Sequence, residues 1–115
     1  MSGSLDVSNR QVNGVDVVVI SGRMDAHSST EAGVNINGLI EGGSRRIVVN
    51  LGGLEYISSS GLRVLLSALK QLKKEGGALK LASLQPSVRE VFAMAGFDRI
   101  FSLFDDEESA VNSFA

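Results

Sequence analysis

The apolar residues of this chain follow a strand pattern first and a helix pattern soon after. Residues 5–12 and 15–21 are two apolar-rich runs separated by Asn13-Gly14, and Asn-Gly between such runs is a strong signal for a two-residue hairpin turn. Residues 17–20 are continuously apolar, which is typical of a strand covered on both faces. The pattern predicts an antiparallel hairpin whose second strand lies inside the sheet.

A helix and a further strand are predicted next. Ser28-Ser29-Thr30-Glu31 has the spacing of a capping box, in which Ser28 and Glu31 cap each other's backbone N–H groups. Apolar residues then recur at helical spacing as far as Gly42-Gly43. Residues 45–51 have the pattern of a buried strand, and a helix between two strands implies a right-handed parallel crossover. The Gly52-Gly53 pair that follows is interpreted as a turn.

The clearest helix spans about residues 59–75, where leucines form one apolar stripe and polar side chains occupy the opposite side. The stripe consists of Leu62, Leu65, Leu66, Leu69 and Leu72. Gly76-Gly77 ends this helix, and further elements are predicted after it. They are a strand over 78–82, a helix from Pro86 to Gly96, a short strand over 99–104 and a helix that starts at the acidic residues 105–108.

Strands and helices that alternate in this way predict an α/β fold with helices layered on a sheet. The chain has 115 residues, which favours a single domain over 1–115. We expect a mixed sheet of roughly four or five strands, antiparallel in the N-terminal hairpin and parallel in the remainder, with about four helices.

Composition removes several kinds of chemistry. The chain has no cysteine and one histidine, His27, so disulfides, thiol nucleophiles and cysteine-ligated metals are excluded. His27 and the nearby Asp25 fall short of the three protein ligands of a catalytic zinc site, and we expect no bound metal. No nucleophile and base pair stands out. We therefore predict neither an enzyme nor a cofactor of its own.

Charge and hydropathy bear on the partners. The formal net charge is −2, which gives no overall attraction to nucleic acid. No apolar run approaches the roughly 20 residues that span a bilayer, so no membrane association is expected. Met1–Leu5 lack the basic and then apolar order of an export signal, and the expected location is cytoplasmic.

Candidate chemistry lies in two loops. Asp25 follows the second strand, and Ser58-Ser59-Ser60 follow the third. In open sheets, functional groups gather at the carboxyl ends of the parallel strands, so the two loops share one edge if their strands are neighbours. Helix capping is a more common role for a serine at such a position than a functional one. Three hydroxyls exceed what one cap needs, and a helix N-terminus also tolerates a phosphate dianion. Capping alone and phosphorylation both remain open.

The segment from Tyr56 to Leu66 resembles the signature of the STAS domain, as found in bacterial anti-sigma factor antagonists of the partner-switching type. The resemblance extends over nearly the whole chain. It includes the turn with Gly22, Met24 and Asp25, the strand over 47–51 and the segment 94–101. It implies a STAS-like fold for this chain.

The resemblance also implies a site. In that family the phosphorylated serine lies two residues before the loop glycine, Gly61, and this position is Ser59 here. A family aspartate at the end of the second strand matches Asp25. Two positions that commonly hold aspartate in the family carry Ser58 and Asn50 in this chain.

Further side chains complete the expected partner-binding surface. Ser58, Ser60 and Gly61 surround Ser59, and Arg63 lies one helical turn away from it. Arg63 belongs to a basic stripe of its helix, and such stripes usually face solvent.

The implied mechanism is a switch. The unphosphorylated chain binds an anti-sigma factor that is also a serine kinase, which releases the sigma factor. Phosphorylation of Ser59 abolishes that binding, and a serine phosphatase restores it. The alternative is a STAS-type scaffold, or a module that binds a small ligand such as a nucleotide, without control by phosphorylation.

Overall fold

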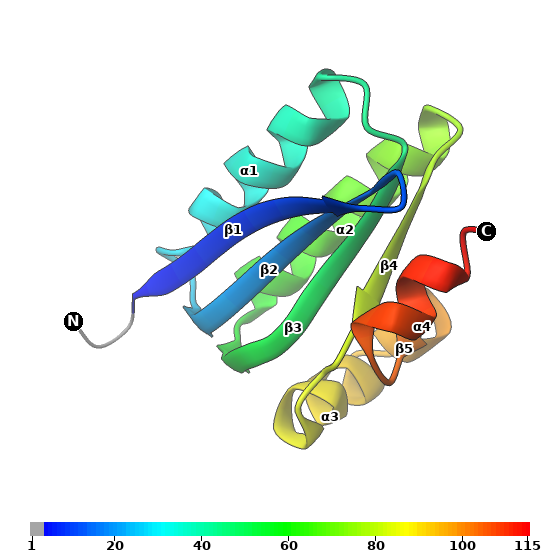
Figure 1. Cartoon of the computed structure of the whole chain (residues 1–115). Coiled ribbons are helices and arrows are strands. Elements are labelled where there is room, and N and C mark those ends of the chain that lie inside the picture. Colours follow the sequence, from blue (N-terminus) through cyan, green and yellow to red (C-terminus); the bar gives the residue numbers. More distant parts are fainter. Residues whose placement is uncertain (1–3) are drawn as a thin grey trace.

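The computed structural model describes residues 4–115. The prediction that Met1–Leu5 form no export signal concerns, in part, Met1–Gly3, which lie outside this range. A five-stranded sheet in the order β1-β2-β3-β4-β5 forms the centre of the molecule (Figure 1). The strands are β1 Leu5–Val12, β2 Val15–Met24, β3 Arg46–Ile57, β4 Ala78–Ala82 and β5 Ser102–Phe104. The helices are α1 Ser29–Glu41, α2 Ser59–Lys74, α3 Pro86–Met94 and α4 Glu107–Asn112, with a short 3-10 helix, η1, over Phe97–Arg99.

The pairing of the strands confirms the predicted mixed sheet. β1 and β2 are antiparallel, whereas β2–β3, β3–β4 and β4–β5 are parallel. Asn13 and Gly14 both have positive φ, 52° and 79°, as the type I′ turn of a two-residue hairpin requires. The Asn13-Gly14 signal therefore predicted the hairpin of β1 and β2 correctly.

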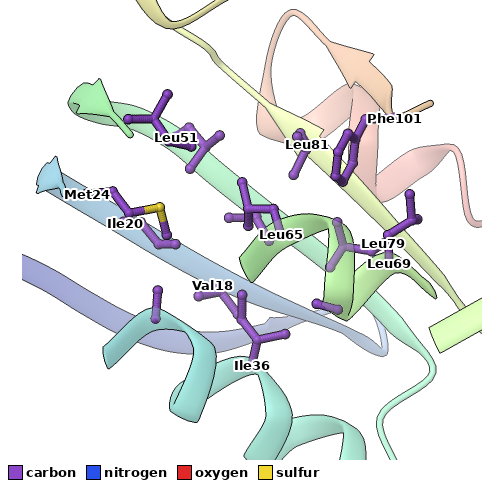
Figure 2. Close-up of a cluster of buried hydrophobic side chains, with 14 of the residues drawn as sticks. Val18, Ile20, Met24, Ile36, Leu51, Leu65, Leu69, Leu79, Leu81 and Phe101 are labelled. Carbon is purple, nitrogen blue, oxygen red and sulfur yellow. The ribbon is translucent and has the colours of Figure 1, made fainter. Parts of the chain in front are cut away.

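Two hydrophobic clusters explain why β2 is apolar without interruption. Val18 and Ile20 face α1 and α2 and belong to the main core, which Figure 2 shows together with Leu65 of α2. Val15 and Val17 face the opposite side, where α4 covers them. β2 is therefore buried on both faces, as its sequence predicted.

β3 differs from the expected strand because it continues to Ile57, and Gly52-Gly53 form no turn. The register with β2 shifts between Val19 and Ser21 and again between Gly22 and Arg23, as β-bulges produce. A Cβ atom at Gly53 would lie 2.4 Å from Ser21 Oγ and 2.9 Å from Ser21 Cβ, so a side chain at this position would force Ser21 to move. The glycines allow a long, bulged strand, because glycine permits the close approach that a bulge brings.

The C-terminal region also departs from its predicted boundaries. The expected strand over 99–104 is shorter, because Phe97–Arg99 form the 3-10 helix and only Ser102–Phe104 pair with β4. α4 begins at Glu107, and the Asp106 side chain accepts a hydrogen bond from the Ser109 N–H. One of the four acidic residues therefore caps the helix, and only the last two lie in its first turn.

Glu107 fixes α4 to two strands of the sheet. Its Oε1 atom accepts hydrogen bonds from Arg10 of β1 and from Asn50 Nδ2 of β3, the latter at 2.9 Å. The bond from Arg10 is the main reason that the pKa of Glu107 lies below its usual value, and the Asn50 bond adds to this against the opposing effect of burial. The Glu107 carboxylate thus attaches the first turn of α4 to β1 and β3.

This attachment predicts a pH dependence of stability. A carboxylate whose pKa is lower in the folded state stabilises the fold above its unfolded-state pKa, and this contribution is lost as the pH falls through the folded-state pKa. Between about pH 5 and pH 3, the melting temperature is expected to fall more steeply for the unaltered chain than for Glu107→Gln. Glu108→Gln, which alters the exposed neighbour, is the control and should follow the unaltered chain. Equal slopes for all three proteins would contradict the attachment.

Within residues 4–115, no helix combines the length and the apolar character needed to cross a membrane.

Candidate functional site

The serine loop joins the end of β3 to the start of α2. Ser58 has an extended backbone, with φ −89° and ψ 172°, and its Oγ accepts a hydrogen bond from the N–H of Gly61 at 3.2 Å. This is the geometry of a helix N-cap. Of the three serines, Ser58 therefore performs the capping.

Ser59 is the first residue of α2 and is exposed, whereas Ser60 is half-buried. Within residues 4–115, no hydrogen bond involves the Ser59 hydroxyl, so this group is free for chemistry. The first N–H groups of a helix carry a partial positive charge. An anionic group on Ser59 would therefore lie in a favourable field.

Gly61 lets the first turn of α2 approach the ends of two strands. A Cβ atom at this buried glycine would lie 2.8 Å from Cγ1 of Ile57 and 2.9 Å from Sδ of Met24. Such distances are too short for real carbon contacts, so a side chain would push the helix away. Gly61 thereby fixes the position of Ser59 relative to β2 and β3.

A backbone hydrogen bond joins the two candidate loops. The N–H of Ser58 donates to the carbonyl of Met24, the last residue of β2, at 2.8 Å. Asp25 follows Met24 directly, so the structure confirms that Asp25 and the serines lie at one edge of the sheet. β2 and β3 are adjacent parallel strands, which is why their carboxyl ends meet here.

The carboxylate of Asp25 organises its own loop. Oδ1 of Asp25 accepts hydrogen bonds from the backbone N–H groups of Ser28, at 2.8 Å, and His27, at 3.0 Å. The backbone hydrogen bond from Ser28 is the largest cause of the lowered pKa of Asp25, followed by that from the Ser28 side chain, and the contact with His27 adds to both. Asp25 is thus held ionised as the cap of the turn before α1.

The capping box expected at Ser28 and Glu31 is absent. Ser28 has a helical backbone, with φ −80° and ψ −19°, and its side chain makes no capping hydrogen bond. Its hydroxyl group lies within donating distance of two acceptors, the carbonyl of Arg23 at 2.7 Å and Oδ1 of Asp25 at 3.0 Å. Asp25 already caps this turn, so the serine hydroxyl connects the loop to the end of β2.

Arg63 lies on the exposed side of α2, at the edge of a shallow groove between α1 and α2. The groove has a volume of about 210 Å³ and is lined by Gly33, Asn37, Arg63, Val64 and Ser67. Arg63 forms no ion pair within residues 4–115. Its guanidinium group is exposed one helical turn from Ser59.

A larger open cavity, of about 550 Å³, lies where α1 ends and β3 begins. Glycines 42 and 43 leave this space open, and the carboxylate of Asp16 is already bonded to Ser44 and Gln11. This cavity lies beside the first residues of β3, whereas the serine loop follows the last residue of β3. The two are therefore at opposite ends of the strands. The one carboxylate of this cavity is thus engaged.

Two residues beside the site were not predicted from the sequence. The guanidinium of Arg23 lies 4.4 Å from the centre of the Tyr56 ring, within the range of a cation–π contact. Both side chains are exposed, and Tyr56 retains 41% of its accessible surface. The bulged register of β2 and β3 brings the pair together, so sequence spacing alone gives no signal for it.

Within residues 4–115, no three histidine, aspartate or glutamate side chains are grouped so as to hold a metal ion.

The capping geometry gives a direct prediction for Ser58. Ser58→Ala is expected to lower the free energy of unfolding by about 1 kcal/mol, because it removes the side-chain acceptor of an N-cap. Ser58→Asp keeps an acceptor at the same place and should retain most of the stability. Urea unfolding of both variants measures the difference. Equal losses in both variants would show that the cap does not act as described.

The fold, the serine loop and the leucine-striped α2 define a known class. A family model described as the STAS domain matches residues 6–110, and this chain belongs to the STAS domain family. BtrV of Bordetella bronchiseptica, whose name proposes an anti-sigma factor antagonist, is 36% identical over 104 residues, covering 90% of each chain.

Solved structures share the fold. An anti-sigma factor antagonist from Mycobacterium paratuberculosis has a TM-score of 0.89 at 23% identity, over 98% of this chain and 97% of its own. The Bacillus cell fate determinant SpoIIAA in its phosphorylated form has a TM-score of 0.75 at 22% identity, over 96% of this chain and all of its own. The names of BtrV and of the mycobacterial protein both refer to anti-sigma factor antagonists, a class of regulatory proteins.

Proposed function

We propose that this chain is an anti-sigma factor antagonist that is switched by phosphorylation of Ser59. The observation that carries the proposal is that two neighbouring serines of the loop have different environments. Ser58 caps α2, and Ser59, next to it, keeps an exposed hydroxyl at the start of the helix. The membership of the STAS family and the name of the BtrV relative support the same role.

The site suits a phosphate without rearrangement of the fold. Phosphoserine carries a charge of about −1.5 to −2 at neutral pH, and the N–H groups at the start of α2 favour negative charge. The exposed position of Ser59 leaves room for the group outside the core. The phosphorylated form of SpoIIAA, a protein of the same fold, is itself known as a structure.

The switch follows from where the charge would lie. We place the partner on the surface formed by Ser59, Ser60 and Arg63 and by the groove between α1 and α2. A phosphate in the middle of such a contact must be desolvated on binding, and it repels acidic groups of the partner. The partner is an anti-sigma factor with serine kinase activity, which binds ATP and Mg²⁺ and transfers the γ-phosphoryl group to the Ser59 hydroxyl, releasing ADP. A serine phosphatase reverses the modification.

Each of the two departures from the family pattern has a local structural role in this chain. The Ser58 hydroxyl accepts the hydrogen bond from Gly61 that an aspartate would also accept. Asn50 donates to Glu107 of α4 and accepts from the N–H of Gly52, so its amide is engaged with α4 and β3. Within residues 4–115, neither side chain forms a hydrogen bond with the Ser59 hydroxyl.

The proposed role implies a cellular location and a domain organisation for this chain. An antagonist of an anti-sigma factor works where transcription takes place, so the proposed location is the cytoplasm. We propose that residues 1–115 form one domain, which acts by binding other proteins and binds no nucleic acid, membrane or cofactor.

Affinity capture tests this function. The unmodified chain, immobilised and exposed to an extract of the organism that encodes it, is expected to retain an anti-sigma factor with a kinase domain. Ser59→Asp as bait should retain much less of it. Calorimetry with ATP and GTP, without any partner, examines the alternative module. Capture of no anti-sigma factor, together with nucleotide binding by the chain alone, would overturn the proposal in favour of that alternative.

A further inference from the structure

We infer that the free edge of β1 is a surface for self-association, through which two copies of the chain pair antiparallel and place Asp6 of each copy opposite Arg10 of the other. This inference concerns the edge of the sheet and goes beyond the proposed function of the serine loop.

β1 presents an accessible edge. It is the first strand in the sheet order and pairs only with β2. Most of its middle residues are exposed, namely Asp6, Ser8, Asn9, Arg10 and Gln11. Within residues 4–115, the hydrogen bonds of Leu5–Val12 to other backbone segments are those with β2. The outward backbone groups of β1 are thus available to another strand.

The hairpin determines which residues face outward. Val12 and Val15 flank the two-residue turn, so they form a hydrogen-bonded pair, and such pairs then alternate along the ladder. Arg10, Ser8 and Asp6 therefore point their backbone groups toward β2. The backbone N–H and C=O groups of the odd-numbered residues, among them Val7 and Asn9, point toward solvent.

One pairing of two β1 strands combines the most contacts with matched charges. When Ser8 lies on the two-fold axis, Val7 hydrogen-bonds with Asn9 of the second copy, and all of residues 5–11 are paired. Asp6 then faces Arg10 of the second copy in a non-hydrogen-bonded pair, where opposed side chains are closest. Opposite charges directly across a ladder stabilise it. The two-fold axis produces this ion pair twice.

Arg10 can serve this contact and keep its place beside α4. Its guanidinium has several N–H donors, and its side chain remains 51% exposed while it contacts Glu107. Asp6, Ser8 and Arg10 lie on the same face of β1 as that contact, because side chains alternate along a strand.

The edge also lacks three of the features that usually prevent such pairing, namely short length, a bulge and proline, and its two charged side chains have opposite signs. β1 has eight residues, no proline and an uninterrupted register with β2, whereas protected edges are short, bulged or interrupted by proline. β5, at the other edge, has three residues. β1 is therefore the edge that can form a stable ladder. Ser59, at the start of α2, is not part of it, so both copies keep a free serine loop.

Sedimentation equilibrium with a backbone variant tests the pairing. The unaltered chain should show a weight-average mass that rises with concentration from that of one chain toward that of two. Asn9→Pro removes an outward N–H that β2 does not use, and proline is tolerated at such edge positions. This variant should stay monomeric, and Asn9→Ala, which keeps the N–H, should still dimerise.

A charge exchange tests the register and does not depend on proline being tolerated. Asp6→Arg and Arg10→Asp each place like charges opposite one another, and each should raise the dimer dissociation constant by about tenfold. In an equimolar mixture of the two variants, every position-6 side chain faces an opposite charge at position 10. The mixture should therefore form a mixed dimer with an affinity close to that of the unaltered chain. Circular dichroism checks that each variant is folded.

Three results would overturn the inference. They are a chain that stays monomeric at millimolar concentration, a dimer that Asn9→Pro leaves intact, and single charge variants whose mixture associates no better than either alone. The last result would mean that β1 does not pair in the register with Ser8 on the axis. It would point to another register or to pairing with a strand of a different protein.

Discussion

Ser59→Asp is expected to lower the affinity of the chain for its anti-sigma factor by about a hundredfold. An unpaired charge buried in a contact surface costs about 3 kcal/mol, and each 1.4 kcal/mol is about a factor of ten in affinity. Ser59→Ala removes only an exposed hydroxyl and should bind within about threefold of the unaltered chain. Calorimetric titration with the purified anti-sigma factor measures all three affinities.

Ser87→Asp is the matched control for this substitution. Ser87 is exposed in the first turn of α3, beside Pro86, so the variant adds the same charge to another helix N-terminus. It should leave partner binding unchanged. An equal loss for Ser59→Asp and Ser87→Asp would point to an effect of net charge, and full binding by Ser59→Asp would contradict the switch.

Leu65→Ala is expected to destabilise the fold strongly. Leu65 is fully buried in the main core, between α2 and the sheet (Figure 2). Removing a buried leucine side chain costs about 2–5 kcal/mol, because transfer energy is lost and a cavity remains. Such a loss is a large part of the stability of a small domain. Urea unfolding followed by circular dichroism gives the difference.

Leu66→Ala provides the comparison within the same helix. Leu66 is only half-buried at the margin of the core, so its truncation should cost about 1 kcal/mol. If both variants lost the same stability, the leucine stripe would not hold α2 in the way described. Since α2 carries Ser59, the comparison also shows how firmly the site is attached to the sheet.

The parts of the fold that local chemistry determines could be predicted from the sequence. The Asn13-Gly14 turn and the leucine spacing of α2 each depend on residues close in the chain. The double burial of β2 was also visible, because a run of apolar residues without alternation has no solvent face.

The errors arose where tertiary pairing overrides a local signal. Gly52-Gly53 have the composition of a turn, yet the pairing with β2 makes them part of a bulged strand. Ser28 has capping spacing, but Asp25 takes that role because its carboxylate reaches the N–H of Ser28. In the site, the exposed place of Ser59 depends on Ser58 accepting from Gly61, and the sequence did not show which serine caps the helix.

The most direct measurement is the mapping of phosphate on the chain after incubation with the captured anti-sigma factor, ATP and Mg²⁺. Mass spectrometry of the digested protein is expected to find one phosphate, on Ser59, and none on the Ser59→Ala variant treated in the same way. Phosphate on Ser58 or Ser60 in the unaltered chain, or continued labelling of Ser59→Ala, would contradict the assignment of the switch to the exposed hydroxyl at the start of α2.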